Sequence, residues 1–156
     1  MCSSDLAICF ALSAWIPPNE LAIWFVVLAA SSVRFWVGGK FLELKDPAAA
    51  TVRKWHVTLA CLTFASNAIW MYPLYGFYFR CSDTGQMFLS MIAAASMSAG
   101  VIMTPSSGRM IWAALVPYTL AMTIPPLLVG DPFHIVLSVL SLGYCLRSEE
   151  HTSELQ

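Results

Sequence analysis

Apolar residues gather in six runs along this chain, and short polar segments separate the runs. A helix needs about 20 mostly apolar residues to cross the roughly 30 Å hydrocarbon core of a bilayer. Several runs approach that length, whereas the first and the last are too short. The pattern therefore predicts an all-α fold, a polytopic membrane helix bundle of about six transmembrane helices with the first and last truncated. The predicted helices cover approximately residues 7–16, 21–44, 47–73, 86–104, 110–129 and 132–146.

The third run shows how a single crossing is oriented. It begins with the basic pair Arg53 and Lys54, continues from Trp55 to Tyr72 without a formal charge, and ends among aromatic residues. Basic residues concentrate on the cytoplasmic side of a membrane, and Trp and Tyr collect where hydrocarbon meets headgroups. The run is therefore predicted to cross from the inside to the outside.

Composition supports lipid as the main partner of the chain. Of the 156 residues, 58% are hydrophobic and 11% are charged, whereas soluble domains average about 45–50% and about 25%. Mean hydropathy is +0.70. The net charge of −1 includes no basic stripe, so nucleic acid is not predicted as a partner. The five cysteines form no CxxC pair, which indicates neither a disulfide framework nor a zinc site.

The two ends differ in character from the rest of the sequence. Residues 1–6 and 147–156 resemble translated sequencing-adapter sequence, and we expect both to be artefacts. A signal peptide is the rival interpretation of the N-terminus, although the basic region that normally begins one is missing. The expected native unit is therefore a transmembrane sensor or anchor domain at residues 7–146.

Cations set the predicted topology. Under strict alternation of the crossings, only Arg80 falls on the side opposite the other basic residues, so the crowded side is predicted to be cytoplasmic. An even number of crossings then leaves both native termini in the cytoplasm. The topology-setting residues are Arg34, Lys40, Lys45, Arg53, Lys54 and Arg109.

Polar residues within the apolar runs are the candidate sensing or helix-packing positions. Ser66 and Asn67 form the most polar point of the third run. An amide in hydrocarbon must find a partner, so Asn67 is predicted to bond a neighbouring helix or to line a ligand pocket. Pro117 and Tyr118 are expected to form a packing kink or the opposite wall of such a cavity.

His134 is the remaining candidate, one turn into the last predicted helix. Histidine changes charge within the physiological pH range, so His134 is predicted either to sense protons or to be an ordinary interfacial residue. His56 lies on the opposite face of the membrane, so the two histidines cannot share a metal. No acid lies in mid-membrane and no catalytic motif is present. The sequence predicts no catalytic, cofactor-binding or metal-binding residue, and no cofactor.

Several short motifs lie at the ends of the predicted helices or within them. They are Arg53-Lys54, Asn67-Ala68-Ile69-Trp70, Gly85-Gln86, Ala99-Gly100, Val116-Pro117 and Gly130-Asp131-Pro132. Together these motifs resemble the N-terminal membrane module of bacterial GGDEF and GGDEF–EAL signalling proteins, which make or degrade cyclic di-GMP. The resemblance implies a location in the bacterial inner membrane.

The resemblance implies a cytoplasmic output domain after the last helix, a diguanylate cyclase or a phosphodiesterase, and a homodimer formed through the parent protein. The GGDEF and EAL motifs are absent from this sequence, so this segment is expected to have no enzyme activity. The membrane module of a sensor histidine kinase is the first alternative. A small transporter-like protein is the second, and it would be expected to show inverted repeats and interrupted helices. The sequence does not identify the stimulus.

Overall fold

The computed structural model describes residues 3–43, 48–103 and 108–153, and every regular element in these ranges is helical. The prediction of an all-α fold is confirmed. The elements are α1 (Ser3–Leu12), α2 (Pro18–Ser31), α3 (Val33–Leu42), α4 (Ala49–Trp70), α5 (Tyr72–Gly76), the 3₁₀ turn η1 (Tyr78–Arg80), α6 (Asp83–Met103), α7 (Gly108–Val129) and α8 (Pro132–Ser153).

Two stretches of helix within the described residues are long and apolar enough to cross a membrane, Pro18–Leu42 and Gly108–Val129. A third apolar stretch, Pro132–Arg147, is shorter. The six-crossing bundle therefore stays a prediction. The charged beginning of α4 and its internal Ser66 and Asn67 explain why that helix is less apolar than its neighbours.

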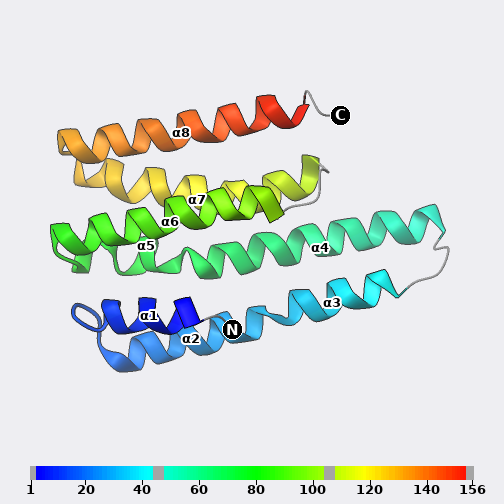
Figure 1. Cartoon of the computed structure of the whole chain (residues 1–156), viewed down its shortest axis with the longest axis horizontal. Helices are drawn as coiled ribbons and strands as arrows, with labels where there is room; N and C mark the ends of the chain where they lie inside the picture. The colour runs from blue at the N-terminus through cyan, green and yellow to red at the C-terminus, as the bar shows by residue number, and fades with distance from the viewer. Residues whose placement is uncertain (1–2, 44–47, 104–107, 154–156) are drawn as a thin grey trace.

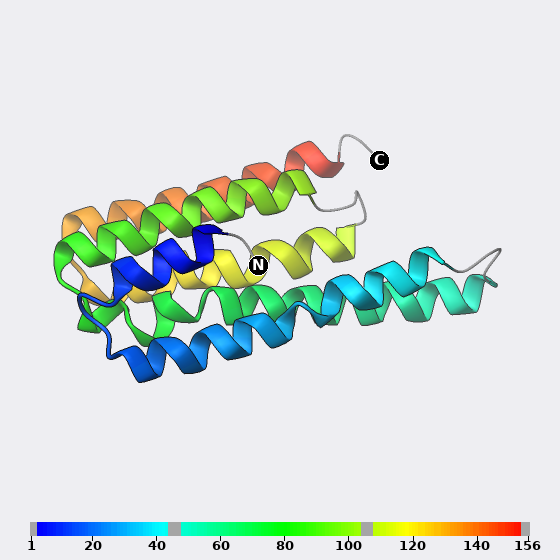
Figure 2. The same cartoon turned by 60° about the horizontal axis from the view of Figure 1, so that its bottom comes forward.

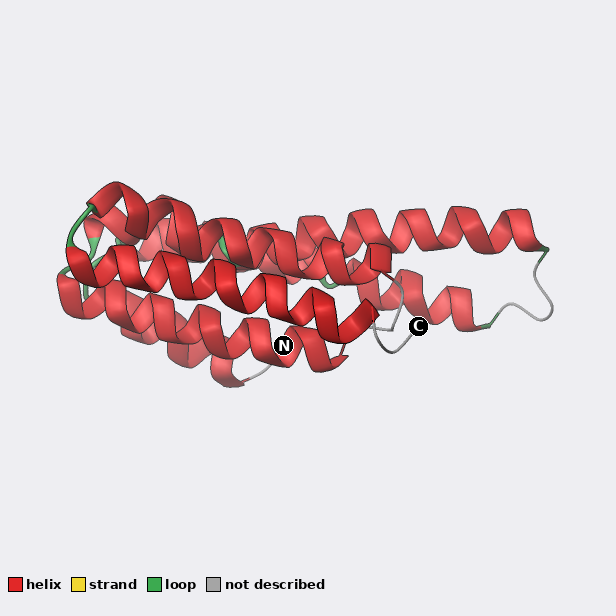
Figure 3. Cartoon of the chain, turned by 90° about the horizontal axis from the view of Figure 1, so that it is seen from above, coloured by secondary structure: helices red, strands yellow, loops and turns green. Residues whose placement is uncertain are grey.

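The long helices run side by side along one axis (Figures 1 and 2). One end of the bundle holds the α1–α2 connection, η1 and the α7–α8 connection; we call it the Arg80 end. The other holds the end of α3 and the start of α4, and we call it the Arg53 end. There the α3–α4 hairpin extends past α6, α7 and α8, as Figure 3 shows. Successive long helices therefore alternate in direction.

Helix α7 is the centre of the packing. It contacts α4, α6 and α8 along its length and α5 near the Arg80 end. Its buried residues occur through most of its turns, and they include Pro117, Pro125 and Pro126. Because each proline removes a backbone donor, α7 is a helix whose internal hydrogen bonding is incomplete and whose surroundings must compensate.

The outer helices present apolar side chains to their surroundings. On α3 the exposed fractions of Phe35 and Trp36 are 68% and 66%, and on α8 that of Leu140 is 65%. These helices form opposite flanks of the bundle in Figure 1. Water-soluble monomers rarely expose contiguous apolar surface on this scale.

The sequence predicted one continuous helix at residues 21–44, but the structure divides it in two. Helix α2 ends at Ser31 and α3 begins at Val33. The Ser31 hydroxyl donates to the Leu28 carbonyl over 2.7 Å, and the Ser32 backbone N–H donates to Ala29 over 3.1 Å. Adjacent serines whose side chains compete for helix carbonyls disturb the regular ladder.

The predicted helix at residues 47–73 also ends early. Helix α4 stops at Trp70, and Pro73 lies in the first turn of the separate helix α5. A proline fits the first turn of a new helix because the N–H there has no helical partner. Residues 44–47, which include Lys45 and the expected start of this helix, lie outside the described residues.

The outermost predicted bounds shift as well. Helix α1 covers Ser3–Leu12 in place of residues 7–16, because the chain turns at residues 13–16 before Pro17 and Pro18 begin α2. Helix α8 continues beyond residue 146 to Ser153; Arg and Glu in this tail have high helix propensity. The remaining two helices start two or three residues earlier than predicted.

Gly85 provides a test of the packing at the Arg80 end. A Cβ at Gly85 would lie 2.8 Å from the Cβ of Cys81 and 3.2 Å from the Trp15 ring, whereas at Gly143 no described heavy atom lies within 4 Å. We expect Gly85→Ala to lower the free energy of unfolding by about 1–3 kcal/mol through overpacking. The control Gly143→Ala should leave it unchanged or raise it by up to about 1 kcal/mol. Unfolding in mixed micelles measures both, and equal stabilities would contradict this packing.

Candidate functional site

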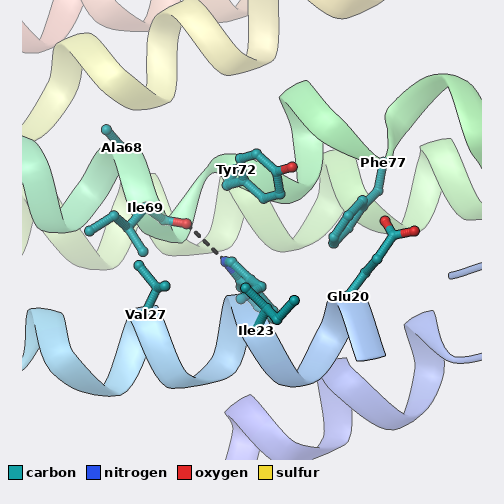
Figure 4. Close-up of a pocket in the computed structure, with 8 residues that line it drawn as sticks. Glu20, Ile23, Val27, Ala68, Ile69, Tyr72 and Phe77 are labelled. Atoms are coloured by element: carbon teal, nitrogen blue, oxygen red, sulfur yellow. Dashed lines mark hydrogen bonds between the residues drawn. The ribbon is translucent and has the colours of Figure 1, made fainter. Parts of the chain in front are cut away.

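An apolar groove lies between α2 and the segment formed by α4 and α5 (Figure 4). Its volume is about 470 Å³, within the range of about 300–1,000 Å³ for ligand pockets. Seven of the eight lining residues are uncharged, and the eighth is an acid at one end. The lining comprises Glu20, Ile23, Trp24, Val27, Ala68, Ile69, Tyr72 and Phe77.

Trp24 fixes the wall of this groove. Its indole N–H donates to the carbonyl oxygen of Ile69 over 2.9 Å, as the dashed line in Figure 4 marks. Its ring stacks on that of Trp70 with centroids 5.9 Å apart, and only 4% of Trp24 is exposed. The groove is therefore built on a rigid contact between α2 and α4. Trp24 and Trp70 therefore pack on each other where the two helices meet.

The acidic end of the groove holds an ion pair. Two nitrogens of Arg80 donate to the two carboxylate oxygens of Glu20 over 2.5 and 3.2 Å, and this pair joins α2 to η1. The hydrogen bond that Arg80 donates to the Glu20 carboxylate raises the pKa of Arg80. This pair was not predicted from the sequence, because its two residues are 60 positions apart.

Asn67 bridges three helices. Its side-chain oxygen accepts a hydrogen bond from Arg34 of α3 over 3.4 Å, and its side-chain nitrogen donates to the backbone carbonyl of Ala114 in α7 over 3.3 Å. Asn67 is buried. The sequence predicted that this amide bonds a neighbouring helix, and the structure contains such bonds. We call Arg34, Asn67 and Ala114 the Asn67 bridge.

Ser66 extends the same contact toward α2. Its hydroxyl donates to the Ser31 hydroxyl over 3.2 Å, and both residues lie at least partly buried between α2 and α4. Ser66 and Asn67 are adjacent and together reach three neighbouring helices. The two candidates thus serve helix packing in this structure, and neither lines the groove.

Pro117 and Tyr118 lie on α7 close to the Asn67 bridge. The Tyr75 hydroxyl donates to the Pro117 carbonyl over 3.1 Å, which joins α5 to α7. Tyr118 is buried and interacts electrostatically with Arg34. The expectation that these residues lie opposite Asn67 agrees with this placement, because Ala114, which Asn67 bonds, is one turn away from both.

His134 belongs to a separate cluster at the Arg80 end. The Asp131 carboxylate accepts from the His134 backbone N–H over 2.9 Å and lies 2.5 Å from its ring nitrogen Nδ1. The His134 ring meets the Tyr78 ring edge-on, with centroids 6.0 Å apart. His134 is 5% exposed. The His134 side chain is therefore buried, and the Asp131 carboxylate caps α8 through the His134 backbone N–H. The spacing of three between Asp131 and His134 was the signal for this contact.

Most of the topology-setting cations lie exposed at the Arg53 end. Lys40 pairs with Glu43 over 2.9 Å, while Arg53, Lys54 and Arg109 are exposed. Arg34 differs, because it reaches the interior through Asn67. Among the described residues, no three His, Cys, Asp or Glu side chains lie close enough to hold a metal ion.

No protein-family model matches this chain, and comparisons with curated proteins and with solved structures give no match either. The features that bear on function are therefore the groove, the Asn67 bridge and the two ends of the bundle.

The Asn67 bridge predicts a measurable loss of stability. We expect Asn67→Ala to lower the free energy of unfolding by about 1–2 kcal/mol, because it leaves Arg34 and the Ala114 carbonyl without this partner. Thr58→Ala is the matched control on the same helix, since the Thr58 hydroxyl is exposed and bonds only the Lys54 carbonyl of its own helix among the described contacts. Detergent unfolding monitored by circular dichroism gives both values. A variant at position 67 as stable as the control would show that the bridge contributes nothing.

The Asp131 cap predicts a pH dependence at the low end. The hydrogen bond from the His134 backbone N–H is the main cause that lowers the pKa of Asp131. A carboxyl with a depressed folded-state pKa stabilises the fold above its unfolded pKa of about 3.9, and this stability is lost as pH falls through the folded value. The stability difference between wild type and Asp131→Ala should therefore shrink as pH falls below about 4. A difference unchanged down to pH 2 would contradict this linkage.

Proposed function

We propose that this chain is the membrane-embedded sensory or anchoring module of a bacterial signal-transduction protein. The observation that carries the proposal is the distribution of polarity: apolar side chains face outward on both flanks, and the polar contacts of Ser66 and Asn67 lie inside. A bundle of this kind suits hydrocarbon, because helices satisfy most of their backbone polar groups internally.

The proposed topology has six crossings in the inner membrane, with the lipid bilayer as partner and both native termini in the cytoplasm. Two apolar helices of spanning length support insertion. The exposed cations Arg53, Lys54 and Arg109 support a cytoplasmic Arg53 end, since basic residues are retained on that side. The only described cation at the Arg80 end, Arg80, is neutralised by Glu20.

In the proposed parent protein a cytoplasmic output domain follows α8, most simply a diguanylate cyclase or a cyclic di-GMP phosphodiesterase acting as a homodimer. The resemblance of the helix-end motifs supports this choice. Helix α8 packs along α7 and its first turn contacts η1, so a rearrangement at the Arg80 end has a direct path to the cytoplasmic side. A stimulus acts only if it binds the two arrangements with different affinity.

Sequencing the native locus beyond residue 146 tests the assignment of the parent protein. A GGDEF or EAL domain in the same reading frame supports the proposal. A histidine kinase core there replaces it with the sensor-kinase alternative, and a stop codon directly after α8 contradicts both.

Cysteine labelling in a cysteine-free background tests the orientation. Native Cys81 is unsuited because it is buried, and burial raises the pKa of its thiol. Ser82 and Ala49 are exposed at the two ends. In intact cells an impermeant maleimide should label Ser82→Cys and spare Ala49→Cys, and permeabilised cells should label both. The reverse pattern would overturn the orientation, and labelling of both in intact cells would contradict membrane insertion.

A further inference from the structure

We propose that the groove between α2 and α4–α5 binds a lipophilic cation, a single positive charge on an apolar or aromatic body, which displaces Arg80 from Glu20. The inference rests on the proposed function, because it supplies a stimulus class for the membrane module. It depends on the lining of the groove, the position of its one charge and the exposure of the ion pair.

The lining selects an apolar ligand body. Aliphatic side chains and three aromatic rings, those of Trp24, Tyr72 and Phe77, make up nearly all of the surface. Ile23 and Tyr72 are 64% and 48% exposed, so the groove opens on the outer surface, where a molecule dissolved in lipid has access. Trp24 is held by its hydrogen bond to Ile69, so this wall needs no rearrangement before binding.

The charge selects a cation. Glu20 is the only ionisable acid or base with a formal charge among the eight lining residues, and Arg80 is not one of them. Figure 4 places the Glu20 carboxylate beside Phe77 at one end, with Val27 and Ile69 at the other. With Arg80 paired to Glu20, an anion at this end gains no free lining cation. A cation at this end meets both the carboxylate and aromatic faces, which attract positive charge.

A phospholipid fits this end less well than a simple cation. Its phosphate would lie against Glu20 without a basic lining residue, and a pocket of about 470 Å³ favours one compact apolar body over two acyl chains. The ligand expected in this groove is therefore a soluble lipophilic cation that reaches it through the membrane.

Displacement of Arg80 is energetically accessible. The side chains of Arg80 and Glu20 are 44% and 37% exposed, and ion pairs this exposed contribute little to stability. A ligand cation bound among apolar groups interacts with Glu20 at lower effective dielectric, where charge attraction is stronger. Since the same pair joins α2 to η1, the ligand would release that connection on binding.

Tetraphenylphosphonium is a suitable probe, and tetraphenylborate has the same shape with the opposite charge. The full chain in nanodiscs of zwitterionic lipid should bind tetraphenylphosphonium saturably, measured by equilibrium dialysis after subtraction of binding to empty discs. Glu20→Gln should weaken binding by about tenfold, equivalent to about 1.4 kcal/mol. Arg80→Gln should tighten binding severalfold, because the competing cation is removed. Asp83→Asn, an exposed acid at the same end outside the groove, should bind as wild type does.

Three results would overturn the inference: no saturable binding, equal binding by wild type and Glu20→Gln, or saturable binding of tetraphenylborate at the same site. Weaker binding by Arg80→Gln would also overturn it, since the pair would then be a support of the groove and not a competitor. The opposite signs expected for Glu20→Gln and Arg80→Gln separate ligand competition from misfolding, which would weaken both. Failure here leaves the labelling pattern and the downstream locus unchanged, so it is distinguishable from failure of the proposed function.

Discussion

The packing of α7 against α4, α6 and α8 positions the other helices of this chain. Helix α7 contains three prolines and is buried through most of its length. Asn67 and Tyr75 each donate a side-chain hydrogen bond to a backbone carbonyl of this helix, those of Ala114 and Pro117. In hydrocarbon these bonds have no competition from water. They fix α4 and α5 at defined positions along the axis of α7.

The same constraint explains where polarity is placed. Polar side chains at Ser66 and Asn67 lie toward neighbouring helices, while large apolar side chains of α3 and α8 lie on the outer flanks. Transfer of those flanks to water would cost about 25 cal/mol of free energy for each Å² of apolar surface exposed. A nonpolar solvent removes this cost and leaves the interior bonds intact. The arrangement thus favours lipid over water, because lipid removes the cost of the apolar flanks and the interior bonds are kept.

Local features of the sequence predicted the helices well, because apolar runs, prolines and capping residues act over a few positions. The break after Ser31 was missed, since it depends on hydroxyls that compete with the backbone. Asn67 was recognised as a residue needing a partner, but Arg34 and Ala114 are 33 and 47 positions away, and only packing identifies them. The groove gave no signal, because Ile23 and Val27 resemble any lipid-facing aliphatic residue in the sequence.

The three-residue turn η1 connects these parts of the molecule. Arg80 pairs with Glu20 of α2, the Tyr78 carbonyl accepts from the side chain of Gln86 in α6 over 3.2 Å, and the Tyr78 ring meets His134 of α8. The first of these contacts is exposed, and exposed ion pairs contribute little to stability. A ligand that breaks the ion pair would leave η1 held by the two buried contacts, to Gln86 and His134. The beginning of α8 would then respond to events in a groove that α8 does not line, which is the coupling a sensory module requires.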